Sequence, residues 1–173
     1  TVALKLLHGR RLDARHLAYF EIERQLLAQM KHPAIAQVYD AGATPDGSPY
    51  FAMEFIEGEP LVRFCEQRRL PLRERLELFI RVCEGVQHAH QKGVIHRDLK
   101  PGNILVSEVD GRPLPKIIDF GIGIATAATR SLAAGQAADG RERAGTPDYM
   151  SPEQAGLDAG IEVDTRSDVY SLG

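Results

Sequence analysis

The residues whose chemistry stands out belong to two short motifs, HRDLKPGN and DFG. Together they supply two carboxylates, Asp98 and Asp119, one amide, Asn103, and one ammonium group, Lys100. A phosphoryl group is transferred through a loose transition state, so the protein must mainly hold Mg²⁺, orient the acceptor hydroxyl and neutralise charge. Carboxylates, an amide and a fixed cation suit these tasks. The two motifs therefore predict phosphoryl transfer from metal-bound ATP.

The composition is that of an ordinary globular protein: of 173 residues, 43% are hydrophobic and 26% are charged. This length allows one core or two small lobes. The formal net charge of −3 provides no basic footprint, so we expect no nucleic-acid partner. Cys65 and Cys83 lie far apart without a Cys-x-x-Cys motif, so neither a disulfide framework nor a zinc site is indicated, and a reducing, cytoplasmic setting fits best.

No apolar run approaches the roughly 18 residues of a membrane-spanning helix, and no secretory signal is recognisable. A membrane anchor outside this segment is left open. The chain begins and ends inside apolar runs. We therefore interpret it as a fragment of a longer protein.

The elements that must position the reactive groups begin with a short apolar strand over 1–7, which carries Lys5 in its middle. Residues 13–30 have helical periodicity, and Glu23 falls within the apolar face. A carboxylate in such a face is costly unless it is paired, so we predict an ion pair between Lys5 and Glu23. The alternative is that Glu23 lies at the boundary of the face and contacts water.

Two strands are expected next, at 34–40 and 49–56, joined by the hairpin signal TPDGS, with a hinge at 57–60. The pattern then becomes helical at 60–69 and at 72–92. The apolar residues that we expect the longer helix to direct into a core are Leu76, Phe79, Ile80, Cys83 and Val86.

Gly93 is placed to end the longer helix in a left-handed conformation. A strand pair at 104–107 and 116–118, turning at Asp110 and Gly111, brings Asp119 beside the loop of Asp98. The segment 122–143 is rich in alanine, glycine and polar residues, and a loop of this length in a compact domain is usually functional or disordered. We expect it to be a mobile activation segment.

In this order, the motifs resemble the middle of a eukaryotic-type (Hanks-type) serine/threonine protein kinase domain, and the pairing of GTP with SPEQ resembles bacterial members. The resemblance spans essentially the whole chain. It implies an α+β, two-lobe fold with a partial, mainly β N-lobe over 1–56 and a partial, α-rich C-lobe over 57–173.

The resemblance implies a role for each catalytic residue. Asp98 would be the base or orienting group for the substrate hydroxyl, and Lys100 would neutralise the γ-phosphate. Asn103 and Asp119 would bind Mg²⁺ or Mn²⁺. His96 is better interpreted as a packing and backbone-bonding residue than as an acid or base.

The cofactor ATP would be bound by the opposite lobe. Lys5 of the VALK motif would contact the α- and β-phosphates and pair with Glu23. Met53 resembles the gatekeeper that precedes the adenine-binding hinge. The remaining cofactor-binding residues implied are Ala3, Glu54, Ile56 and Leu105.

The substrate side is expected around the segment GTPDYMSPE, where Thr146 would hydrogen-bond near Asp98 and Lys100. Arg97 is either a surface cation or part of a pocket for an activation-segment phosphate or carboxylate. Between Leu132 and Gly145 the chain has no Ser or Thr, so Asp139, with Glu142, is a candidate substitute for phosphate. Residues nearer the start of the segment that remain candidate autophosphorylation sites are Thr126, Thr129 and Ser131.

The resemblance further implies that Asp168 braces the backbone of the catalytic loop. The function that we predict is an ATP- and Mg²⁺-dependent protein serine/threonine kinase that acts on protein substrates. The alternative is a pseudokinase or scaffold that binds partners, against which the intact Lys5, Asp98, Asn103 and Asp119 argue. Because the chain contains neither the glycine-rich loop nor the later helices, activity of this segment alone is left open.

Overall fold

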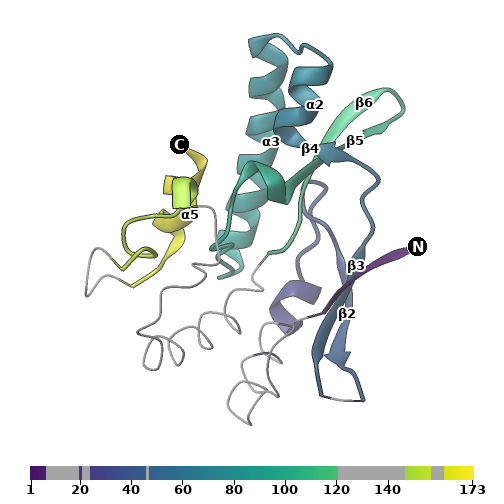
Figure 1. Ribbon diagram of the computed structural model, residues 1–173, viewed down its shortest axis with the longest axis vertical. Coiled ribbons are helices and arrows are strands. Elements are labelled where there is room, and N and C mark those ends of the chain that lie inside the picture. The colour runs from purple at the N-terminus through teal and green to yellow at the C-terminus, as the bar shows by residue number, and fades with distance from the viewer. Residues whose placement is uncertain (7–19, 21–23, 46, 121–146, 157–161) are drawn as a thin grey trace.

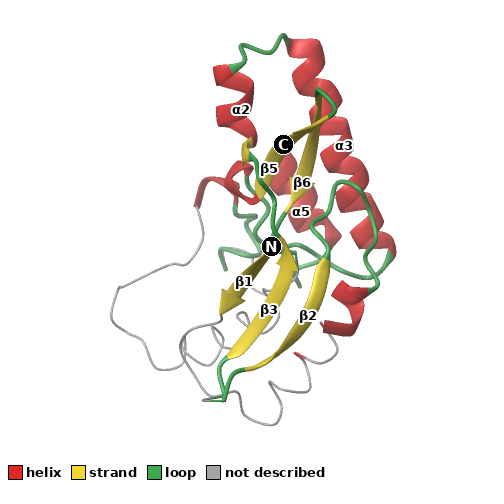
Figure 2. Cartoon of the chain, turned by 90° about the vertical axis from the view of Figure 1, so that its right-hand side faces the viewer, coloured by secondary structure: helices red, strands yellow, loops and turns green. Residues whose placement is uncertain are grey.

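The computed structural model describes residues 1–6, 20, 24–45, 47–120, 147–156 and 162–173 (Figure 1). In the helix expected over 13–30, the backbone at 24–28 is helical. The activation segment expected over 122–143 lies outside the described residues. Figures 1 and 2 show a sheet at one end of the molecule, with helices and a β-hairpin at the other.

The first sheet is antiparallel and has the order β1-β3-β2, from β1 (Val2–Leu6), β2 (Val38–Ala43) and β3 (Pro49–Glu54) (Figure 2). The register pairs Ala3 with Met53 and Lys5 with Phe51. Paired residues share a face of the sheet, and Phe51 and Met53 are buried. Ala3 and Lys5 therefore belong to the inner face, and the strand predicted around Lys5 is confirmed.

The prediction of a strand at 34–40 is wrong at its start, because β2 begins only at Val38. Ala34 and Ala36 instead bond to Ile117: its N–H donates to the Ala34 carbonyl (2.8 Å) and its carbonyl accepts from the Ala36 N–H (2.9 Å). The backbone groups of 34–36 are thus used to join the first sheet to the second. The hairpin at Thr44 is confirmed, since its N–H donates to the Ser48 carbonyl at 2.9 Å.

The second sheet has the order β4-β5-β6, formed by β4 (Glu59–Pro60), β5 (Ile104–Val109) and β6 (Arg112–Ile117). Asp110 and Gly111, with φ of 52° and 73°, form the two-residue turn, and positive φ at both positions is the geometry of a type I′ hairpin. The predicted strand pair is confirmed and extends further along both strands. Its second strand ends two residues before Asp119.

The two predicted helices are confirmed as α2 (Leu61–Gln67) and α3 (Leu72–Gln91). Gly93 follows α3 with a φ of 75°, as expected for a left-handed residue at a helix end. The later elements are the 3-10 turns η1 (Pro101–Asn103) and η2 (Pro147–Tyr149) and the helix α5 (Thr165–Leu172).

The face predicted for α3 is partly wrong. Leu76 and Ile80 are 50% and 56% exposed. The residues of α3 that are buried are Leu78, Val82, Gly85, Val86 and Ala89. A Cβ on Gly85 would lie only 3.1 Å from Ile117 and 3.2 Å from Ala34, so the helix approaches these two residues closely at Gly85.

One core connects the two sheets, because Phe51 and Met53 belong to the same buried cluster as Val82, Val86 and Ile117. Phe20 packs against Phe51 with ring centroids 5.0 Å apart. In the described part of the chain, no helix is long and apolar enough to cross a membrane.

Candidate active site

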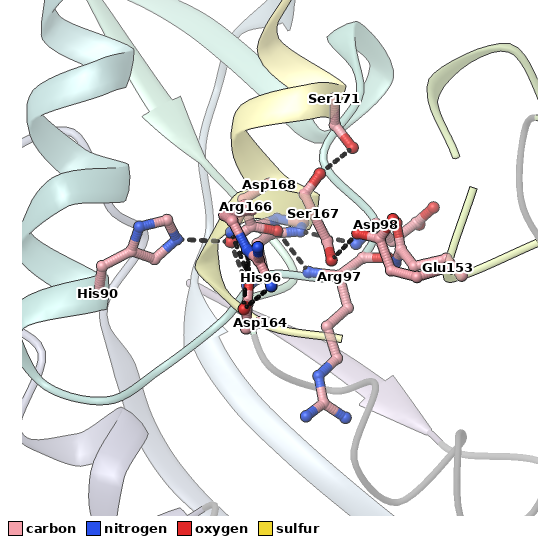
Figure 3. Close-up of polar contacts among 11 residues, drawn as sticks. His90, His96, Arg97, Asp98, Glu153, Asp164, Arg166, Ser167, Asp168 and Ser171 are labelled. Atoms are coloured by element: carbon pink, nitrogen blue, oxygen red, sulfur yellow. Dashed lines mark hydrogen bonds and ion pairs between the residues drawn. The ribbon is translucent and has the colours of Figure 1, made fainter. Parts of the chain in front are cut away.

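A buried carboxylate organises the catalytic loop. Asp168 lies in the first turn of α5, is 0% exposed, and accepts hydrogen bonds from the backbone N–H groups of His96 and Arg97, both at 2.8 Å. The imidazole Nε2 of His90 on α3 lies 2.8 Å from the same carboxylate (Figure 3). A buried carboxylate is tolerated only when its oxygens are hydrogen-bonded in this way. The brace expected from Asp168 is confirmed.

His96, the first residue of the HRDLKPGN motif, is buried against the segment that carries the DFG motif. Its Nε2 lies 3.0 Å from the Ile118 carbonyl, and its Nδ1 accepts from the Asp98 N–H at 3.2 Å. Its ring meets Phe120 edge-on, with centroids 4.7 Å apart. Burial lowers the pKa of the His96 imidazole, which favours the neutral ring with the proton on Nε2. The backbone-bonding role predicted for His96 is confirmed.

The side chain of Asp98 is half exposed and fixed from two sides. Lys100 Nζ lies 2.9 Å from its carboxylate, and Asn103 Nδ2 donates to its Oδ2 at 3.0 Å and to its backbone carbonyl at 2.7 Å. Asn103 is itself buried in the short turn η1, whose first residue is proline. The carboxylate thus has a defined orientation while 51% of the side chain remains accessible.

Asp119 follows β6 in a left-handed conformation, with a φ of 65°, and its carboxylate lies 2.8 Å from Lys5 Nζ. Positive φ is strained for a residue other than glycine and is concentrated at functional sites. The N–H of Ile118 donates to the carbonyl of Asn103 at 2.9 Å. This bond ties the segment that ends in Asp119 to the loop that carries Asp98.

Lys5 was expected to pair with Glu23, which lies outside the described residues, so that pairing stays a prediction. Within the described part, the ion pair of Lys5 is with Asp119, and both side chains are partly exposed. Lys5 comes from the first sheet and Asp119 from the end of the second. Their contact therefore closes the site between the two sheets.

The predicted hinge residues lie at the end of β3. Met53 is buried, whereas Ala3, Ile56 and Leu105 are half-buried. The Glu54 carboxylate accepts from Lys116 Nζ at 2.7 Å and from the Gln37 N–H at 3.1 Å. The side chain of Glu54 is therefore bound by the protein, and its backbone N–H donates to the Gln37 carbonyl at 2.8 Å.

Arg97 is held through its backbone, and Figure 3 shows its side chain extending away from Asp168. Among the described residues, none provides a hydrogen-bond partner for its buried Nε. Asp139 and Glu142, predicted opposite Arg97, and Thr146, predicted near Asp98 and Lys100, fall outside the described part of the chain. Their roles stay predictions.

The sequence did not predict three residues that contribute to the site: His90, Lys116 and Gln154. Lys116 could have been found, because a lysine within an apolar strand needs a partner, as was argued for Lys5. His90 looked like an ordinary helix residue. Gln154 stands in an irregular segment with no periodicity, yet its Nε2 donates to the Arg97 carbonyl at 2.6 Å.

The donor set suits a hard cation. Mg²⁺ is usually held by one or two carboxylates together with substrate phosphates and waters. Asp119 offers a carboxylate, and Asn103, whose Nδ2 is used by Asp98, offers its amide oxygen. Within the described residues, no group of three or more His, Cys, Asp or Glu forms a cage for a metal. The site thus fits a cation shared with a phosphate ligand.

Comparison with known proteins agrees with this geometry. The protein kinase domain family matches residues 1–173. The chain is 37% identical to serine/threonine-protein kinase pkn2 of Myxococcus xanthus over 99% of its length, and 42% identical to serine/threonine-protein kinase PknB of Mycolicibacterium smegmatis over 89%. It is 38% identical to the DNA damage-responsive serine/threonine-protein kinase RqkA of Deinococcus radiodurans over 99%.

The chain covers 20% of the first of these relatives and 24% of the other two. Among solved structures, the kinase domain of Mycobacterium tuberculosis PknI matches with a TM-score of 0.71 and 30% identity. That match covers 99% of this chain and 60% of the other. The chain thus corresponds to only part of each longer relative.

Proposed function

The chain belongs to the protein kinase domain family, in its bacterial serine/threonine branch, and from this premise we propose that its protein transfers the γ-phosphate of ATP to serine and threonine hydroxyls of protein substrates. Its two parts are the partial N-lobe and C-lobe of the kinase fold, and we place their boundary between Ile56 and Glu57.

The observation that carries the proposal is the fixed orientation of Asp98. Asp98 comes directly after His96 and Arg97, whose backbone N–H groups are bound by Asp168. Its carboxylate contacts Lys100 and Asn103. Orientation of a reacting group accounts for much of the rate enhancement in reactions that need little covalent chemistry. A carboxylate held in this way is suited to orient a hydroxyl and take its proton.

The nucleotide side is supported by Lys5, Asp119 and Asn103. The ammonium group of Lys5 would neutralise phosphate charge, and Asp119 and Asn103 would hold Mg²⁺. When bound, Mg²⁺ or Mn²⁺ would neutralise the charge on the phosphate oxygens during transfer. Lys5 already lies 2.8 Å from Asp119, so the cationic and metal-binding groups are adjacent before ATP enters.

In the proposed reaction, the substrate hydroxyl oxygen attacks the γ-phosphorus in line with the bond to the β-phosphate oxygen. An O–P bond forms to the substrate as the O–P bond to ADP breaks. The hydroxyl proton passes to Asp98, and Lys100 offsets the charge on the transferred group. The products are ADP and the phosphorylated substrate.

The partners that this function implies are proteins with accessible serine or threonine, in a cytoplasmic setting, without a nucleic-acid partner. Lys100 beside Asp98 supports serine or threonine as the acceptor. A substrate-binding role for Thr146 and a regulatory role for Asp139 opposite Arg97 remain part of this proposal.

The test measures transfer of γ-labelled phosphate from ATP by the full-length protein. The substrates are three peptides that are identical except for the acceptor residue, which is Ser, Thr or Tyr. We expect ATP- and Mg²⁺-dependent labelling of the Ser and Thr peptides and not of the Tyr peptide. Nucleotide binding without any transfer would reject the proposal and support the pseudokinase alternative. Labelling of the Tyr peptide alone would overturn the acceptor assignment.

A further inference from the structure

The amide of Gln154 lies between the segment 147–156 and the catalytic loop. Its Nε2 donates to the backbone carbonyl of Arg97 at 2.6 Å. Its Oε1 accepts from the N–H of Ser151 at 3.3 Å and from the Ser151 hydroxyl at 3.0 Å. One side chain thus joins two parts of the site that are 57 residues apart in sequence.

The orientation of this amide is fixed by its partners. The Ser151 N–H can only donate, and the Arg97 carbonyl can only accept, so the oxygen of Gln154 must face Ser151 and its nitrogen must face Arg97. Ser151 is 0% exposed, so water has no access to replace that partner. Neither a carboxylate nor an apolar side chain could satisfy both contacts.

The contact matters because of the residue that receives it. Arg97 has a φ of 66°, a strained conformation for a residue with a side chain, and such conformations persist only when the surroundings hold them. Asp168 holds the N–H of Arg97 at 2.8 Å. Gln154 holds its carbonyl, so both backbone polar groups of Arg97 are fixed from outside the loop.

The Arg97 carbonyl belongs to the peptide unit that joins Arg97 to Asp98. Because a peptide unit is planar, fixing its oxygen also fixes the plane from which the Asp98 side chain extends. Lys100 and Asn103 control the far end of that side chain, as described above. Gln154 fixes the backbone at the base of the Asp98 side chain through the Arg97 carbonyl.

We propose that Gln154 is a positioning residue, which couples the placement of the segment 147–156 to the orientation of Asp98. The role in turnover rests on the proposed kinase function, whereas the contact itself does not. An ordered 147–156 segment then orients Asp98 for transfer, and displacement of that segment releases the Arg97 carbonyl.

The test compares Gln154→Ala and Gln154→Met in the full-length protein with Gln87→Ala, a control at an exposed glutamine of α3. Met keeps most of the volume and removes the polar contacts, so it serves if the Ala variant fails to fold. The first readout is the backbone ¹⁵N–¹H resonance of Asp98 and its rate of hydrogen exchange. We expect the resonance to shift and exchange to accelerate in both Gln154 variants, and neither change in the control.

The second readout is steady-state phosphoryl transfer. A small misplacement of a reacting group costs up to about 100-fold in rate, so we expect kcat to fall about 10- to 100-fold. The KM for ATP should stay near that of the wild type, because Lys5 and Asp119 do not depend on Gln154. A general loss of structure would instead lower kcat and raise the KM for ATP together.

An unchanged Asp98 resonance in the Gln154 variants would overturn the proposal whatever the activity. A shifted resonance with wild-type kcat would also overturn it. If the Asp98 resonance shifts in the Gln154 variants but the wild-type protein itself transfers no phosphate, the kinase function is refuted and the positioning contact is supported.

Discussion

The carboxylate of Asp168 accepts a hydrogen bond from the backbone N–H of His96 over 2.8 Å, although 72 residues of chain separate them. Helix α5 supplies the carboxylate, and the loop between α3 and η1 supplies the N–H. The same carboxylate also binds Arg97 and His90. The catalytic loop is therefore shaped by a buried acceptor rather than by its own short-range hydrogen bonds alone.

Replacing Asp168 with Asn should strongly destabilise the fold. The amide loses one acceptor and places a donor against backbone N–H groups in a site with no exposure. Loss of one member of a buried charged network costs about 3–5 kcal/mol. Urea denaturation of the full-length protein measures this change in unfolding free energy.

The matched control is Asp164→Asn at the N-cap of the same helix, where Asp164 accepts from the Arg166 N–H. Asn caps helices about as well as Asp, so this variant should unfold close to the wild type. Equal unfolding midpoints for the two variants would contradict the brace.

The ion pair between Glu54 and Lys116 should couple the end of β3 to β6. Both side chains are about one-fifth to one-quarter exposed, 26% and 19%, so solvent screening is incomplete. A double-mutant cycle with Glu54→Gln and Lys116→Met should give a coupling energy on the order of 1 kcal/mol.

A cycle on Arg73 and Glu77, an exposed pair one turn apart on α3, provides the comparison. Exposed pairs contribute little, so its coupling should be close to zero. Equal coupling in the two cycles would mean that the Glu54 contact does not tie the sheets together.

The free energy of unfolding should fall as the pH is lowered from 7 to 5. Burial lowers the pKa of both His96 and His32 below the usual 6.5, so below that pH the unfolded chain binds protons that the folded chain does not. The contribution of these two histidines to the free energy of unfolding is thus fully present above about pH 6.5. It is lost as the pH falls toward their pKa values in the folded protein. The lowered pKa values of Glu153 and Asp164 take effect only at more acidic pH.

His96→Gln tests the source of this dependence, because Gln can still donate to the Ile118 carbonyl but does not titrate. The variant should lose less stability than the wild type between pH 7 and pH 5. Denaturation at a series of pH values provides the measurement, and an identical slope in the two proteins would exclude His96 as a source.

Much of this arrangement was predictable from local pattern. The strand around Lys5, the hairpin from Ile104 to Ile117 and the glycine after α3 carry short-range signals, and each was predicted. The brace from Asp168 was expected from motif resemblance. These features depend on alternation, turn residues and a fixed order of motifs.

The features that the sequence predicted wrongly or did not predict have a common physical cause. Each depends on a partner that is distant in the sequence. Helix α3 buries a face that combines Leu78 and Val82 with the small residues Gly85 and Ala89, which allow close packing, whereas Leu76 and Ile80 stay exposed. Residues 34–36 look like a strand, but Ile117 takes their hydrogen bonds. The role of Gln154 likewise requires knowledge of which segment lies opposite. For Lys116 the sequence indicates that a partner is needed, but not that Glu54 supplies it.

The central claim is that Asp98 is oriented to accept the proton of a substrate hydroxyl. The most direct test is phosphoryl transfer by full-length Asp98→Asn beside the wild type, with ATP affinity measured in parallel. Asn preserves the shape and keeps one oxygen that can accept from Asn103, but it removes the charge and the second acceptor oxygen, so we predict a loss of at least about 100-fold in kcat. The affinity for ATP should be unchanged. Transfer at the wild-type rate by Asp98→Asn would contradict the account.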